Sequence, residues 1–296
     1  MSRILVGVDG STASDAAVRY AGDVAARHGG ELHVAHVVTG YATLVPTAVE
    51  GLEEAGHAVL EQALALAGPL VEAGAPAGAT VRGELLHGQR QAALLEAAKG
   101  ADLVVLGFQP HSSLERLVTG STTTALAAGA HCPVTIVPDG WSGNHRGVVG
   151  VGVKTVDTAG PLLRKALGIA RKRGARLEIL HTWHLPTTAY DALMLPDQLD
   201  TDGWSEDMHA ALKEVCDPIC ADYPEVRTET RVLERHPAAA LAGLGERVDL
   251  LVLARRARLF PRGHLGGTAR AMLREVPCPI LVVPPPGEDE EPDPLV

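Results

Sequence analysis

Three hydroxyl side chains follow a glycine at the start of one predicted helix. These residues are Gly120, Ser121, Thr122 and Thr123, and the helix is expected over residues 122–130. Amide N–H groups at a helix N-terminus attract anions, glycine lets a ligand approach the backbone closely, and hydroxyl groups add donors. The combination suits a phosphate chain in a sequence that contains no G-x-x-x-x-G-K-[ST] loop. A simple helix cap is the alternative, and the residue types alone leave both interpretations open.

A carboxylate stands at the end of the first predicted strand, residues 4–8. Asp9 could accept hydrogen bonds from ribose hydroxyls, as the acidic residue of a dinucleotide-binding fold does. Asp9 and Gly10 are also a common turn pair, so a plain turn is the alternative. The loops after Val8, Val38 and Leu106 are where we expect ligand chemistry, because open parallel sheets bind ligands at the carboxyl ends of their strands.

Short apolar runs that alternate with Ala- and Leu-rich segments must position these residues. Strands are predicted over residues 4–8, 32–38, 80–86, 103–106 and 134–137, and helices from residue 12 and over 49–73, 89–98 and 122–130. Thr12 and Asp15 have the spacing of a capping box, and Gly29 and Gly30 are expected to end the same helix. Continuous apolar strands with helices between them predict a parallel sheet that is covered on both faces.

The chain repeats this organisation once. The segment D-L-V-V-L at 102–106 returns as D-L-L-V-L at 249–253, and C-P-V-T-I-V-P at 132–138 returns as C-P-I-L-V-V-P at 278–284. The sequence therefore predicts an α/β protein with two tandem Rossmann-like domains, each a five-stranded parallel sheet with helices on both faces. We expect domains over residues 1–139 and 148–284, a linker at 140–147 and a disordered acidic tail at 285–296.

Composition excludes several classes of partner. The 296 residues carry 26 Lys and Arg against 36 Asp and Glu, a net charge of −10, and five of the acids lie in the last nine residues. Only 3% of the residues are aromatic, which leaves little for base stacking. We expect neither nucleic acid nor an anionic membrane as partner. The chain shows no signal peptide, no membrane span and no disulfide framework, so a cytoplasmic location is expected.

Metal chemistry is not expected. His181 and His184 have a spacing that could hold a metal ion, but no acidic or cysteine partner recurs near them. His36 and His181 occupy equivalent strand positions in the two copies, which favours a packing role common to both.

Five segments together resemble the universal stress protein family. They are I-L-V-G-V-D-G-S at 4–11, H-V-V at 36–38, D-L-V-V-L-G at 102–107, G-S-T at 120–122 and C-P-V-T-I-V-P at 132–138. The ATP-binding branch of that family carries G-x2-G-x9-G-[ST]. Here Gly107, Pro110, Gly120 and Ser121 have this spacing, with proline in place of the middle glycine. Two copies that span nearly the whole chain are similar to tandem members common in actinobacteria.

This resemblance implies HUP-type domains and an ATP site in the first copy, with or without Mg²⁺. Asp9 would contact the ribose or adenine region, Val37 would give backbone contacts to the adenine, and Gly107 would pack near the ribose. The phosphates would lie against Gly120, Ser121, Thr122 and Thr123, and Gly10 would complete the site beside Asp9. Pro110 has no N–H to donate, which removes one phosphate contact and leaves the ATP affinity open.

The second copy departs further from the pattern. Lys154 stands where the first copy has Asp9, and Ala254 and Ala257 stand in the positions of the first two motif residues, Gly107 and Pro110. The following loop contains four arginines, which could attract a phosphate-bearing ligand or form a solvated basic loop: Arg255, Arg256, Arg258 and Arg262. The sequence thus predicts a degenerate second site.

The leading hypothesis is a nucleotide-sensing or regulatory stress-response protein that binds ATP in its first domain, with slow hydrolysis at most. A scaffold of the same fold that binds no nucleotide is the alternative. An adenylating enzyme is disfavoured, since the loop after the first strand is too short and glycine-poor to hold a pyrophosphate. In the resembled family the last strand of the domain is an exposed edge that pairs antiparallel across a two-fold axis. Residues 134–137 and 280–283 stand at this position, and because an unpaired apolar edge is a liability, we expect them to pair within one chain. A further homodimer is left open.

Overall fold

The computed structural model describes residues 2–40, 46–74, 79–109, 121–143, 145–155, 159–184, 201–255, 266–275 and 277–285. Two compact units make up the chain. Unit 1 consists of Met1–Asn144 together with Arg255–Val296, and unit 2 consists of His145–Ala254. The expected tail beyond residue 285 lies outside the described residues.

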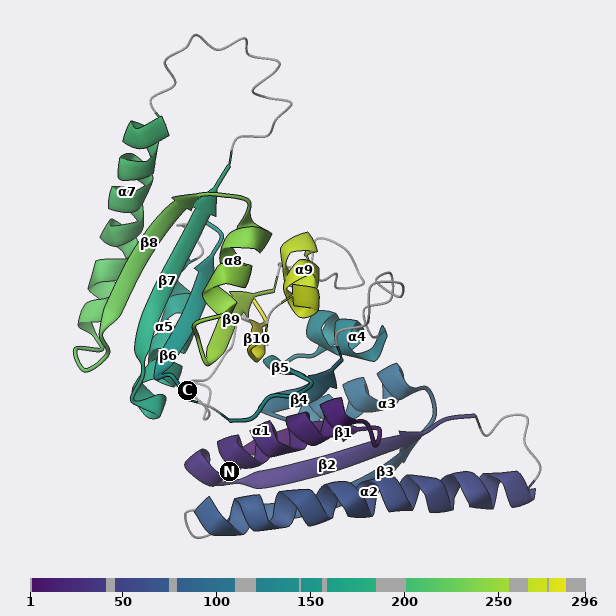
Figure 1. Ribbon diagram of the computed structural model, residues 1–296. Coiled ribbons are helices and arrows are strands. Elements are labelled where there is room, and N and C mark those ends of the chain that lie inside the picture. Colours follow the sequence, from purple (N-terminus) through teal and green to yellow (C-terminus); the bar gives the residue numbers. More distant parts are fainter. Residues whose placement is uncertain are drawn as a thin grey trace, which may run out of the picture. The chain divides into compact units, whose positions relative to one another are not determined.

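In unit 1 the strands of a parallel sheet alternate with helices along the chain (Figure 1). Its strands are β1 (Arg3–Val8), β2 (Glu31–Val38), β3 (Thr80–His87), β4 (Leu103–Phe108) and β5 (Val134–Pro138). The helices between them are α1 (Thr12–His28), α2 (Pro46–Gly74), α3 (Arg90–Ala97) and α4 (Ser121–Gly129). The strand order is β3-β2-β1-β4-β5, and every neighbouring pair is parallel.

The chain leaves β1 toward β2 on one side and reaches β4 on the other, so the order reverses between β1 and β4. Helix α1 packs against α2, and α3 packs against α4, so helices cover the sheet in two pairs. Apolar β-branched residues and leucines fill the strands, and Ile4, Leu5 and Val6 are fully buried. This architecture places the carboxyl ends of β1 and β4 at a topological switch point, where such sheets bind ligands.

The two ends of α1 test the helix start and the helix stop that the sequence predicts. Ser11, rather than Thr12, is the N-cap residue, and its side chain accepts a hydrogen bond from the Ser14 N–H. The expected capping box at Thr12 is therefore wrong by one residue. Gly29 follows the helix with φ 71° and donates its N–H to the Ala25 carbonyl, so the predicted stop is confirmed.

In the described part of the chain, unit 2 repeats the topology with four parallel strands in the order β9-β6-β7-β8. Its strands are β6 (Val148–Val153), β7 (Arg176–Trp183), β8 (Thr228–Glu234) and β9 (Leu250–Ala254). Its helices are α5 (Ala159–Arg173), α7 (Thr201–Ala221) and α8 (Pro237–Gly245). Helices α5 and α7 pack together over β6 and β8, and α8 contacts β6, β7 and β9.

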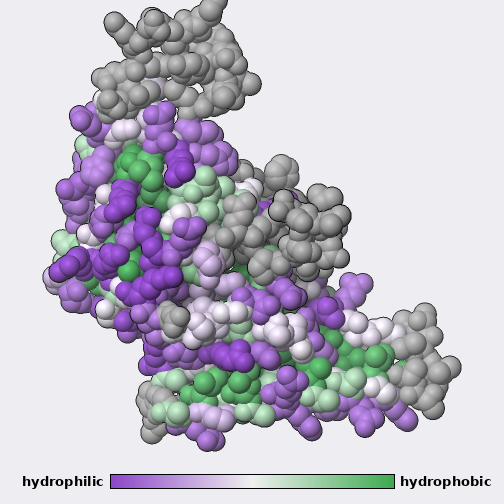
Figure 2. Space-filling model, in the orientation of Figure 1, coloured by the Kyte–Doolittle hydropathy of each residue, from purple (hydrophilic) through white to green (hydrophobic). Residues whose placement is uncertain are grey.

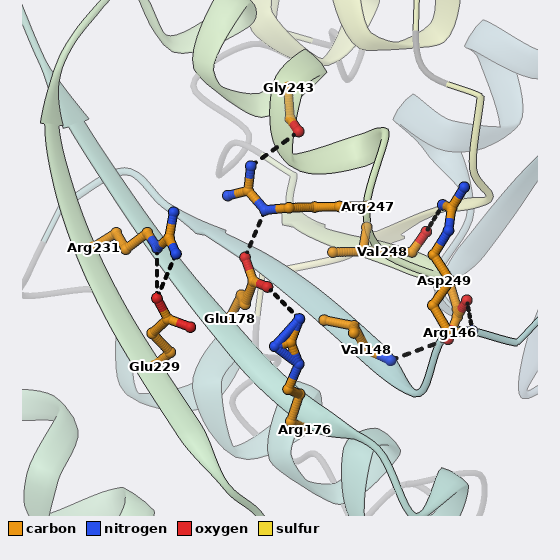
Figure 3. Close-up of polar contacts among 10 residues, drawn as sticks. All are labelled: Arg146, Val148, Arg176, Glu178, Glu229, Arg231, Gly243, Arg247, Val248 and Asp249. Atoms are coloured by element: carbon orange, nitrogen blue, oxygen red, sulfur yellow. Dashed lines mark hydrogen bonds and ion pairs between the residues drawn. The ribbon is translucent and has the colours of Figure 1, made fainter.

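Residues that recur in both copies make the same contacts. Asp102 accepts a hydrogen bond from the Arg3 N–H, and Asp249 accepts one from the Val148 N–H (Figure 3). His36 Nδ1 lies 2.8 Å from the Val8 carbonyl oxygen, and His181 Nδ1 lies 3.0 Å from that of Val153. The packing role expected for the two histidines is confirmed. The repeated aspartate connects the first strand of each copy, through a hydrogen bond, to the start of the fourth strand.

The last elements of the second copy belong to unit 1. They are α9 (Gly267–Glu275) and β10 (Ile280–Val283), and β10 pairs antiparallel with β5. Ile280 lies opposite Ile136, and Val282 lies opposite Val134. The predicted pairing of the two terminal strands within one chain is confirmed. The α/β class and the helix-flanked parallel sheets are confirmed as well, whereas the exact domain boundaries stay predictions.

The beginning of the segment expected to link the copies packs against α1 of unit 1. The Trp141 ring packs edge-on against Tyr20 of α1, with 5.2 Å between the ring centroids, and Tyr20 is buried. The beginning of the segment therefore extends the core of unit 1, although its composition is that of a polar linker.

Candidate functional site

A pocket of about 390 Å³ lies at the carboxyl ends of the unit 1 strands. Residues from four elements that end or begin there form its walls: the end of β1, the start of α1, the end of β4 and the start of α4. Residues of β2 and α3 complete it. The location is the switch point at which the sequence predicts a ligand site.

Asp9 is held in place by the start of α1. Its Oδ1 accepts hydrogen bonds from the Ser11 N–H at 3.1 Å and from the Ser11 hydroxyl at 2.6 Å. Burial tends to raise the pKa of this carboxyl group, but the hydrogen bonds from Ser11 and Ser14 and the charge of Arg90 together hold the pKa below its usual value. Asp9 is therefore ionised at neutral pH and is poised to accept hydrogen bonds rather than to take up a proton.

Asp139 joins three loops around the pocket. Its Oδ2 accepts a hydrogen bond from the Thr12 hydroxyl at 3.0 Å and one from the Gln109 side-chain amide at 3.4 Å. Its backbone N–H donates to the Phe108 carbonyl. The end of β5, the end of β4 and the start of α1 are thereby fixed to one another, which pre-organises the pocket walls.

Gly107 allows β4 to approach the start of α1. A Cβ atom at this position would collide with the Ala13 carbonyl group and would lie 2.7 Å from the Ser14 nitrogen. Because these atoms belong to the backbone, they cannot move aside cheaply, so the position requires glycine for packing. The sequence assigned this glycine only to contact with a ribose and did not reveal this structural role.

The start of α4 contributes Thr122 and Thr123 to the pocket wall. Thr123 is only 7% exposed, and Val37 of β2 is 4% exposed on the β2 side of the pocket. The walls therefore combine hydroxyl groups and helix-start amides at α4 with apolar side chains at β2 and α3.

The structure brings together five of the eight predicted site residues: Asp9, Val37, Gly107, Thr122 and Thr123. Gly10 lies beside Asp9 with φ +80°, but it is not among the residues that line the pocket. Gly120 and Pro110 lie outside the described residues, and Ser121 begins α4 with a side chain that is likewise outside them. The ligand contacts assigned to all eight residues stay predictions.

Arg90 is a pocket residue that the sequence did not single out. It is the first residue of α3, its side chain is exposed, and its charge helps to lower the pKa of Asp9. The available signal was its position four residues after the end of the third predicted strand, residues 80–86. Arg90 adds a fixed positive charge to the pocket.

In the second copy, Arg255 does not belong to a basic loop. Its guanidinium is buried, and Nη1 donates to the Ala130 carbonyl at 2.7 Å and to the Ala127 carbonyl at 3.5 Å. For this residue both sequence interpretations, phosphate attraction and a solvated loop, are wrong. Lys154 is exposed directly after β6, and Arg256, Arg258 and Arg262 lie outside the described residues.

Figure 2 shows apolar patches interspersed with hydrophilic residues on the side of unit 1 that carries α2. Isolated exposed apolar residues such as Leu52 are common on soluble domains and indicate no ligand.

Membrane and metal contacts gain no support from the described part of the chain. None of its helices is both long and apolar enough to cross a lipid bilayer. Within the same residues, no group of three or more His, Cys, Asp or Glu is placed to hold a metal ion. Burial raises the pKa of the Cys216 thiol to about 11, which disfavours the thiolate that metals bind.

Comparison with known proteins agrees with this fold. A sequence profile of the universal stress protein family matches residues 1–138 and 146–284. The chain belongs to this family. As a universal stress protein with two copies of the domain, it is similar over its whole length to tandem relatives. A universal stress protein of Mycolicibacterium smegmatis is 29% identical over 95% of this chain and 97% of its own length.

Two further relatives support the tandem organisation. The universal stress protein Rv1996 of Mycobacterium tuberculosis is 28% identical and covers 94% of both chains. Among solved structures, a universal stress protein from Archaeoglobus fulgidus matches with a TM-score of 0.71, 18% identity, and coverage of 96% of this chain and 98% of its own. The last similarity supports the fold alone.

Proposed function

We propose that the pocket of unit 1 binds an adenine nucleotide, with ATP as the principal ligand, and that the protein acts as a nucleotide-sensing regulator in the stress response. The observation that carries the proposal is the convergence of Asp9, Val37, Thr122, Thr123 and Arg90 on one pocket of about 390 Å³ at the switch point of the sheet. Ligand sites of small molecules fall in this size range and at this place in α/β folds.

Each part of a nucleotide has a complementary part of the pocket. The ionised Asp9 suits the ribose hydroxyls as a hydrogen-bond acceptor. The apolar side chains of Val37 and Leu94 suit the adenine ring. The N-terminus of α4, with the hydroxyls of Thr122 and Thr123, suits the phosphates, and Arg90 offsets part of their charge. Mg²⁺ would enter with the phosphates.

The pocket favours binding over turnover. Asp9 has a lowered pKa and is already hydrogen-bonded to Ser11, so it is a weak base for activating water. We therefore propose a binding protein, with ATP hydrolysis that is slow at most. The alternative is a scaffold that binds no nucleotide, for which Lys154 and Ala254 of the second copy are the supporting features.

The test is a titration of purified protein with ATP, ADP, AMP, adenosine and GTP in a calorimeter, after any co-purified nucleotide has been released and identified by chromatography. Asp9→Ala should weaken adenosine and ATP binding alike, by about 1.5–3 kcal/mol, because a charge-assisted hydrogen bond is lost. Thr123→Val should weaken ATP binding but leave adenosine binding unchanged.

Matched controls come from the same unit. Glu61→Ala removes an exposed carboxylate on α2, and Thr80→Val removes an exposed hydroxyl at the start of β3. Both variants should bind like the wild type. Absence of adenine nucleotide binding in the wild-type protein contradicts the proposal and favours the scaffold.

A further inference from the structure

A buried arginine holds the far end of the helix that forms the phosphate side of the pocket. Helix α4 begins at Ser121, lines the pocket with Thr122 and Thr123, and ends at Gly129. At that end Arg255 donates from Nη1 to the Ala130 carbonyl at 2.7 Å and to the Ala127 carbonyl at 3.5 Å. Its own backbone N–H donates to the Val283 carbonyl of β10 at 2.7 Å. Arg255 thus fixes the end of α4 relative to the strand that pairs with β5.

The chemistry of this contact is that of a helix C-cap. The last carbonyl groups of a helix have no intrahelical donor, and the negative end of the helix dipole attracts a cation. Arg255 is only 8% exposed, and burying a guanidinium group is costly unless it is hydrogen-bonded. Because the buried Arg255 guanidinium depends on these hydrogen bonds, it is well suited to hold the C-terminal end of α4 in one position.

The first copy shows that the fold itself does not require an arginine at this position. In the repeat, Ala254 corresponds to Gly107, so Arg255 corresponds to Phe108, which is an apolar residue and 7% exposed. Arg255 comes from the copy whose own site has diverged, yet it belongs to the same compact unit as the pocket.

We propose that Arg255 is a positioning residue for the phosphate side of the unit 1 pocket. The inference rests on the proposed nucleotide binding and adds to it that the second copy of the repeat supports the site of the first. Helix α4 has nine residues and is about 13 Å long, so a shift at its C-terminus is transmitted to Thr122 and Thr123. Asp9 directly follows β1 and Val37 belongs to β2, so the nucleoside side of the pocket does not depend on α4.

Two substitutions separate positioning from simple stability. Arg255→Met keeps a long side chain but removes the hydrogen bonds to α4, whereas Arg255→Lys keeps the charge and one donor group. Arg270→Met is the matched control, because Arg270 is exposed on α9 in the same unit. Circular dichroism and thermal unfolding identify a temperature at which every variant is folded, and the affinities are measured at that temperature.

The measurement is the affinity of each variant for ATP and for adenosine, together with amide hydrogen exchange in α4. For Arg255→Met we expect ATP affinity to fall on the order of tenfold while adenosine affinity changes less than about twofold, a typical coupling between distant groups. Exchange in α4 should increase, Arg255→Lys should restore part of the ATP affinity, and Arg270→Met should match the wild type.

The outcomes are distinguishable. If the folded Arg255 variants keep the wild-type affinities for both ATP and adenosine, the positioning role is wrong and the proposed function stands. If ATP and adenosine affinities fall by the same factor, Arg255 acts on the stability of the whole unit and the positioning role is again wrong. If the wild-type protein binds neither ligand, the proposed function fails and the inference fails with it.

Discussion

Asp9 shows how local hydrogen bonds prepare a carboxylate to accept further hydrogen bonds. Sequence alone left it as a turn residue or a ribose acceptor, and the structure shows that these two roles are compatible. The Ser11 cap that starts α1 also binds the Asp9 carboxylate, so the turn holds the acceptor at the pocket in its ionised form.

The ionisation of Asp9 leads to a prediction about pH. Because its pKa lies below the usual 3.8, Asp9 stays charged throughout the range from pH 5 to 8. The ratio of adenosine affinities between wild type and Asp9→Asn should therefore be constant over this range, as measured by calorimetry. A ratio that falls severalfold between pH 7 and pH 5 contradicts the lowered pKa.

The positions of two arginines could not be predicted from the residues around them in the sequence. Arg90 reaches the pocket only because β3 and α3 end and begin beside it, and Arg255 is buried only because its part of the second copy folds with unit 1. Neither fact depends on local sequence. Asp9 and the threonines of α4 were predictable because a parallel sheet brings the loops that follow its strands to one edge, whereas Val37 came from the family resemblance.

At the scale of single elements, most boundaries could be read from the chain. The second strand, expected at 32–38, is observed at Glu31–Val38, since the apolar run that makes a strand buried also makes it recognisable. Contacts between elements are harder to predict. The close approach of β4 to α1 at Gly107 follows from their packing, which no pattern in either segment specifies.

Gly107→Ala tests that packing. The added methyl group collides with the backbone of Ala13 and Ser14, so the free energy of unfolding should fall by about 1–3 kcal/mol, and nucleotide binding should weaken because Asp9 moves with α1. The control is Gly68→Ala in α2, where a Cβ has no neighbour within 4 Å and alanine should be neutral or stabilising. Urea denaturation measures both. Equal stability of the two variants contradicts the close approach.

The second strand of each copy buries an ionisable residue at the equivalent position. In unit 2, Glu178 lies 2.9 Å from both Arg176 and Arg247 (Figure 3). In unit 1 the residue is His33, with Nε2 2.7 Å from Glu84 and Nδ1 3.2 Å from an Arg3 nitrogen. The Arg3 donor requires an unprotonated Nδ1, so His33 is neutral. Burial is the main cause of its lowered pKa, with Arg3 and Arg82 acting in the same direction and Glu84 opposing.

A buried neutral histidine makes stability depend on pH. Below pH 6.5 the unfolded chain binds a proton at His33 while the folded protein does not, so the stability present above pH 6.5 is lost as the pH falls toward the lower folded pKa. Urea denaturation between pH 7 and pH 5 should show a steeper loss for wild type than for His33→Gln, by at most about 1.4 kcal/mol per pH unit.

The control for that comparison is His57→Gln, which removes an exposed histidine of α2. It should keep the wild-type slope. Parallel pH dependences for the wild type and His33→Gln contradict the assignment of a neutral, buried His33.

At the scale of the whole molecule, the repeat predicted the tandem organisation, and the family resemblance added the pairing of the last strands. It did not predict that α9 and β10 would group with the first copy, because that depends on contacts between the copies and not on either copy alone. One consequence is that β5 has no exposed edge on its β10 side.

Removing β10 should therefore uncover an apolar edge strand. Deletion of residues 277–296 leaves the buried residues of β5 without their antiparallel partner, and such edges associate with other chains. Size-exclusion chromatography with light scattering should show larger species than for the control, a deletion of residues 286–296 that removes all but the first residue of the predicted acidic tail and keeps β10. Identical masses for the two truncated proteins contradict the role assigned to β10.

The central claim is that two copies of one fold provide one nucleotide site, and the stoichiometry of ATP binding tests it most directly. Equilibrium dialysis of the full chain against ATP should give one ATP per chain. Asp9→Ala should abolish or strongly weaken this binding, whereas Lys154→Ala, at the equivalent position of the second copy, should leave it unchanged. No bound ATP, or binding that survives Asp9→Ala and is lost in Lys154→Ala, contradicts the account.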